Sequence, residues 1–231
     1  MIDIVLIAIL AGVTWCVASE GFAGALQTAI ICILSGLLAM NFFEPMAGAL
    51  SGMLPAAYNA WADAISLLVL YAVLVTAMRL GVEKVAPGFP DTKKPLFEGG
   101  RWFGALLSGY VTMAFLLTAF HTAPVPRDFM GFKPERSNLF EVAAPDRQWL
   151  GFTQYVSEKS LSKWGNPNIF DGSQMTVGNA SNQVWASFPI RYATRRENLA
   201  VSNSAAPAPI TDNDAARPSN NNARPSGGSG F

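Results

Sequence analysis

Long stretches without a charged residue constrain the fold of this chain more than any other feature. Sixteen uncharged residues follow Asp3, twenty-three follow Glu20, fifteen follow Asp63 and twenty-five follow Arg101. A helix of about 20 apolar residues crosses a hydrocarbon core about 30 Å thick. The spacing therefore predicts four transmembrane helices, near residues 2–18, 22–43, 61–80 and 101–120.

The composition supports a membrane protein and excludes several other classes. Of the 231 residues, 51% are hydrophobic and 14% are charged, whereas soluble domains carry about 25% charged residues. Apolar residues surround the predicted helices instead of forming one stripe, unlike the helices of a soluble protein. Sixteen basic and sixteen acidic residues balance, without the positive field of a nucleic-acid-binding protein. We predict an all-α membrane protein whose partner is the lipid bilayer.

Residues for a metal, cofactor or catalytic site are scarce. One histidine and two cysteines are too few for a zinc site built by the chain alone. No GxSxG, phosphate-binding or HExxH motif occurs. We expect no enzymatic activity, no catalytic residues, no cofactor and no metal, and we interpret His121 as a cap at the membrane interface.

The first apolar segment has one alternative interpretation, a cleaved signal peptide with a cleavage site at Val17-Ala18-Ser19. Signal peptides begin with positive charge, but no Lys or Arg precedes Arg79. We therefore expect the segment to remain as a helix.

Residues 45–62 are also uncharged, but Pro45, Gly48, Gly52 and Pro55 interrupt them. Backbone exposed to lipid must satisfy its own hydrogen bonds. The interruptions predict a short interfacial helix or a re-entrant hairpin and not a fifth span.

The basic residues predict the orientation. Residues 79–101 contain five Lys or Arg residues, and the loop between the second and third predicted helices contains none. Loops rich in Lys and Arg stay in the cytoplasm, so both termini are predicted outside it. Three basic residues soon after the fourth helix count against this orientation: Arg127, Lys133 and Arg136.

The C-terminal half is more polar. We interpret residues 121–200 as a weakly structured extramembrane extension on the outer side. Within it, Asp146 is expected to cap an amphipathic helix on which Trp149, Phe152, Thr153 and Val156 share a face. Alternation between Val184 and Tyr192 predicts an edge strand. Residues 201–231 are rich in Ala, Pro, Ser, Asn and Gly, which predicts a disordered tail.

Two short motifs and the order of the elements resemble a known family. Asp3 opens the first helix and Gly21 lies in a tight link to the second, while Gly100, Arg101, Gly104 and Ser108 begin the last helix. Over residues 1–120 this arrangement resembles the CvpA family, the colicin V production proteins, which are four-helix bacterial inner-membrane proteins.

The chain also departs from the family pattern. Ser19 and Glu20 stand where the family has basic residues, Gly100 replaces an aspartate, and Ser108 replaces a glycine. The resemblance implies a multi-pass protein of the inner membrane with an accessory role in toxin production or export, or in the cell envelope, and implies no reaction.

Small residues recur along the last helix in two parallel rows, one containing Gly100, Gly104 and Ser108 and the other containing Ala105 and Gly109. In lipid, small residues four apart allow helices to approach closely. These rows fit either packing within the four-helix bundle or an interface with a second copy or an export protein.

Two other functions also fit the sequence. One is a small oligomeric channel or transporter, although no ionisable residue is predicted at mid-bilayer, where transport pathways have them. The other is a membrane anchor that presents residues 121–231 to an envelope partner.

Overall fold

A computed structural model describes residues 2–85, 94–125, 129–132, 137–157, 188–189 and 192–193. This part of the chain is helical and contains no strand beyond an isolated bridge between Leu139 and Ala143. The elements are α1 (Ile2–Ala18), α2 (Gly21–Ser51), the 3-10 helix η1 (Ala56–Trp61), α3 (Ala62–Val85), α4 (Lys94–Thr122), the 3-10 helix η2 (Phe129–Gly131) and α5 (Pro145–Tyr155).

Three of the four predicted spans are confirmed as helices long and apolar enough to cross a membrane: Gly21–Ser51, Tyr58–Val85 and Phe97–Thr122. The first, α1, is apolar but has 17 residues, about 25 Å of helix. Large apolar side chains also lie on the outside of the bundle, with Ile4 and Trp15 each 74% exposed and Phe103 64% exposed. Such an apolar exterior fits a multi-pass membrane protein.

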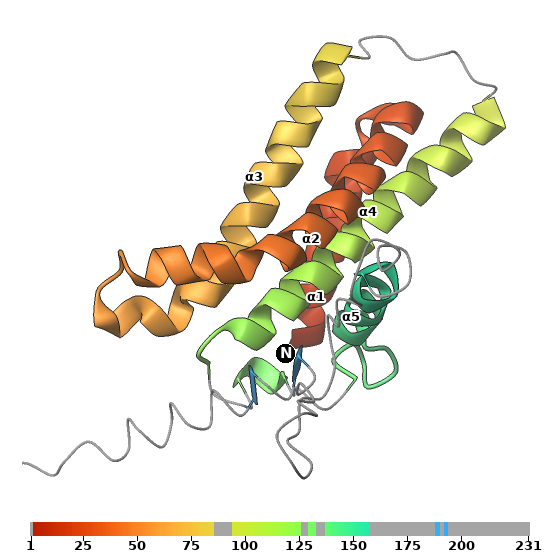
Figure 1. Cartoon of the computed structure of the whole chain (residues 1–231). Coiled ribbons are helices and arrows are strands. Elements are labelled where there is room, and N and C mark those ends of the chain that lie inside the picture. Colours follow the sequence, from red (N-terminus) through yellow and green to blue (C-terminus); the bar gives the residue numbers. More distant parts are fainter. Residues whose placement is uncertain are drawn as a thin grey trace, which may run out of the picture.

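The predicted break at Pro45 is wrong. Helix α2 continues through Pro45 to Ser51, and a separate short helix, η1, follows only after Pro55. Proline lacks the N–H that would bond to the carbonyl of Asn41, so it bends a helix without always ending it. The C-terminal part of α2 turns away from the bundle (Figure 1).

Helix α4 lies at the centre of the bundle. It packs mainly on α2 and α1, and also on α5 and α3, whereas α3 packs mainly on α2. The N-terminus of α1 lies at the same end as the C-terminal end of α4 (Figure 1). The main core is aromatic: Tyr71 of α3 stacks on Phe115 of α4 at 4.2 Å, and Trp149 of α5 meets Phe115 edge-on at 6.1 Å.

The extension past α4 differs from the sequence prediction in two respects. Helix α5 forms as expected, but Ala144 occupies its N-cap position, and Asp146 lies inside the first turn with a fully buried side chain. The strand expected near residue 190 is not found, because residues 188–189 and 192–193, the described part of it, are helical. Phe188 and Tyr192 are buried in the main core. The predicted tail, 201–231, lies outside the described residues.

Candidate functional site

The glycines of the CvpA-like motif lie where helices touch. Gly21 begins α2 with a φ of +84°, a conformation that glycine adopts without strain. A Cβ on Gly104 of α4 would lie 2.7 Å from the carbonyl carbon of Ala25 and 2.8 Å from the nitrogen of Leu26, both backbone atoms of α2. Gly100 faces the ring of Phe22, also on α2, closely enough that a Cβ would overlap it.

The second row of small residues lies against α1. A Cβ on Gly109 would lie 2.9 Å from the carbonyl oxygen of Leu10, and Ala105 is fully buried in a cluster with Val17 and Ala18. Ser108 is also fully buried and donates a hydrogen bond of 2.8 Å to the carbonyl of Gly104. Both rows therefore serve packing within the bundle.

The two charged residues of the motif lie towards opposite ends of the bundle. Asp3 Oδ1 accepts a 2.6 Å hydrogen bond from the backbone N–H of Phe140, so it ties the start of α1 to the loop before α5. Arg101 pairs with Glu98 at 3.1 Å, one turn earlier on α4, and its guanidinium lies 5.3 Å from the Trp102 ring centroid.

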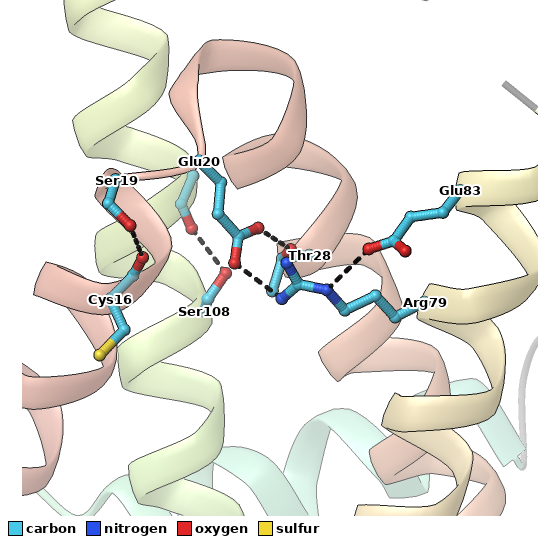
Figure 2. Close-up of polar contacts among 8 residues, drawn as sticks. Cys16, Ser19, Glu20, Thr28, Arg79, Glu83 and Ser108 are labelled. Atoms are coloured by element: carbon cyan, nitrogen blue, oxygen red, sulfur yellow. Dashed lines mark hydrogen bonds and ion pairs between the residues drawn. The ribbon is translucent and has the colours of Figure 1, made fainter. Parts of the chain in front are cut away.

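An ion-pair cluster joins the α1–α2 turn to α3 (Figure 2). Glu20 accepts hydrogen bonds from Arg79 at 2.7 Å and from the hydroxyl of Thr28 at 3.1 Å, and Arg79 also pairs with Glu83 at 3.2 Å. The Glu20 and Arg79 side chains are 23% and 42% exposed. This Glu20–Arg79 cluster holds α3, which otherwise packs mainly on α2, to the turn that precedes α2.

We expect Arg79→Met to lower the free energy of unfolding by about 1 kcal/mol, the upper range for partly exposed ion pairs. Glu83→Gln removes only the more exposed i,i+4 pair, so its expected loss is about 0.3–0.5 kcal/mol. Unfolding in mixed micelles measures both. Equal losses would show that the contact between Arg79 and Glu20 does not hold α3.

The second polar contact is completely buried. His121 of α4 and Asp146 of α5 meet at 2.7 Å between Nε2 and Oδ2, and neither side chain is exposed to solvent. His121 Nδ1 and Asp146 Oδ1 have no hydrogen-bond partner. The ring of Phe132 packs edge-on against the imidazole, with centroids 4.8 Å apart. The expectation that His121 is an interfacial cap is therefore wrong.

Sequence reasoning missed this His121–Asp146 pair, although a signal was present. Positions 146, 149 and 153 lie on one face of a helix, and the pattern predicts Trp149 and Thr153 on its apolar face. Asp146 therefore had to point into the protein, where a carboxylate needs a partner. The chain has a single histidine.

The described residues contain no group of three or more His, Cys, Asp or Glu side chains placed to hold a metal ion. A polar contact does occur in the main core, where the hydroxyls of Tyr71 and Thr112 lie 3.1 Å apart, close to Cys32. These groups bind neighbouring helices to each other.

Comparisons with known proteins returned no relatives. No protein-family model matches the chain, and neither a curated protein nor a solved structure is significantly similar to it. The resemblance to the CvpA family thus rests on the residues and the order of elements given above.

Proposed function

We propose that the chain is a non-enzymatic, CvpA-like protein of the bacterial inner membrane, acting as an accessory in toxin export or envelope maintenance. The observation that supports it most is the contact of Gly104 with the backbone at Ala25 and Leu26. This glycine belongs to the motif on which the resemblance rests. It lets α4 and α2 approach closely at the position where the family pattern requires a small residue.

The proposal includes four spans, with both termini outside the cytoplasm. Helix α1 packs along α4, and Gly109 of α4 lies against Leu10 near the middle of α1. Because α4 is long enough to span, α1 occupies the same depth, and modest local thinning of the bilayer accommodates its 17 residues.

A periplasmic reporter enzyme fused after Ala123, at the end of α4, tests the orientation. We expect activity outside the cytoplasm, because the strongly basic segment 79–101, which includes the ends of α3 and α4 that face each other in the sequence, is predicted to stay inside. A fusion after Lys84 is the matched control and should report the cytoplasm. Cytoplasmic activity of the Ala123 fusion would show that the four-span, both-ends-out arrangement is wrong.

The accessory role is tested in the source bacterium by deleting the gene. We expect reduced release of exported peptide toxins or increased sensitivity of the envelope to detergent, restored by the parent chain but not by Gly104→Leu. Unchanged toxin release together with unchanged envelope integrity would contradict the role.

A second function, transport, is favoured by one observation, the buried His121–Asp146 pair. Ionisable side chains buried within membrane proteins often mark ion or proton pathways. Flux assays on purified protein in vesicles separate the two proposals: an accessory leaves proton and ion flux at background, whereas a transporter raises it and loses the increase in Asp146→Asn.

A further inference from the structure

Helix α5 lies beside the membrane-spanning parts of α2 and α4. Asp146 contacts His121 at the end of α4, and Gln148 hydrogen-bonds to Tyr110. Trp149 and Phe152 line a small pocket with Leu107 of α4 and Ile33 of α2. From His121 back to Leu107 is about 21 Å along α4, and this stretch lies inside the apolar segment Phe97–Thr122.

The contact between α5 and α2 independently places α5 at membrane depth. A Cβ on Gly36 would lie 2.5 Å from Cζ2 of Trp149, so the indole fills the space that this glycine leaves. Gly36 lies about 22 Å from the start of α2 at Gly21, within the thickness of a hydrocarbon core of about 30 Å.

We infer that α5 is a re-entrant helix, seated against α4 and the Gly36 region of α2 in the half of the bilayer nearer the end of α4, and that the His121–Asp146 pair holds it there. The inference rests on the membrane-spanning assignment of α2 and α4 within the proposed function, and not on which side of the membrane the termini face.

The length of α5 excludes a span, and its buried side fits packing on protein. It has 11 residues, far fewer than the roughly 20 that crossing requires. Its inward side carries Trp149, Leu150 and Thr153, all buried, which packs the helix on protein as a partial insertion at membrane depth requires. Arg147, in the first turn, lies near the end of α4, where a long cation reaches the interface.

The His121–Asp146 pair fixes the position of α5 along α4. Apolar packing alone would let α5 slide along α4, but a buried carboxylate must stay with its imidazole because no solvent reaches it. Because α5 is part of the membrane core, it is not presented to a partner outside.

Site-directed spin labels measure the depth of α5 in reconstituted vesicles. Position 151 is suitable because Gly151 is exposed and nothing lies within 4 Å of its Cβ direction. In a variant with Cys16 and Cys32 replaced by alanine, we expect a label at Gly151→Cys to collide with oxygen more than with a water-soluble nickel chelate. Controls are Val73→Cys on α3, 56% exposed, and Val142→Cys in the loop before α5, 86% exposed.

The three labels separate the outcomes. An oxygen-to-nickel ratio at position 151 close to that at 73 supports the re-entrant seating, and a ratio close to that at 142 overturns it. Low collision with both reagents at 151 would place it inside protein and also overturns it. A ratio at 73 equal to that at 142 would contradict the membrane assignment itself, which is part of the proposed function.

The role of the pair is tested on the same label. His121→Leu should shift the ratio at position 151 several-fold towards the value at 142, and adding Asp146→Leu should restore it, because no polar side chain is then buried without a partner. An unchanged ratio in folded His121→Leu protein would overturn the claim that the pair holds α5.

Discussion

Replacing His121 with leucine is expected to lower the free energy of unfolding by about 3–5 kcal/mol, the cost of removing one partner from a buried, hydrogen-bonded pair. Asp146 is fully buried and its Oδ1 already lacks a hydrogen bond. After the substitution, neither carboxylate oxygen would have a hydrogen-bond partner. Reversible unfolding in mixed micelles of detergent and lipid measures the loss.

The double variant separates the pair from simple packing. His121→Leu with Asp146→Leu replaces both polar side chains by apolar ones of similar size, and such replacements of buried pairs are often neutral or stabilising. We therefore expect the double variant to unfold within about 1 kcal/mol of the parent, less destabilised than either single variant. Additive losses in the double variant would show that the two residues act independently.

The sequence is sufficient to predict the helical segments, because charges are expensive in hydrocarbon and rarely interrupt a span. The residues at which the helices begin and end are less predictable. Pro45 is a helix breaker in water, yet α2 passes through it. Residues 94–100, assigned to the basic loop, extend α4 by nearly two turns, since Phe97 packs against Phe22 and Gly21.

Contacts between distant segments could not be read from the chain. The glycine rows predict close approach but not which helix is approached, and the structure assigns Gly104 to α2 and Gly109 to α1. Glu20 and Arg79 are 59 positions apart, and they meet because α3 returns alongside α2. Each contact depends on how whole helices are arranged in space, and the local sequence pattern does not determine that arrangement.

Gly104→Ala adds one methyl group and is expected to destabilise the bundle by about 1–3 kcal/mol, the usual cost of overpacking. We expect the loss to lie in the upper part of that range. The new Cβ would lie 2.7, 2.8 and 2.9 Å from three backbone atoms of Ala25 and Leu26. Backbone atoms inside a helix cannot rotate aside as a side chain can, so α4 and α2 must separate along their contact.

Gly99→Ala is the matched control, on the same helix and with nothing within 4 Å of the added methyl group. Alanine favours a helix by about 1 kcal/mol over glycine, so Gly99→Ala should raise the free energy of unfolding while Gly104→Ala lowers it. Because both variants make the same chemical change, opposite changes in the free energy of unfolding would separate the effect of the helix contact from that of helix propensity. If both variants were stabilised, α4 would not approach α2 at Gly104. The glycine in the motif on which the family resemblance rests would then have no packing role.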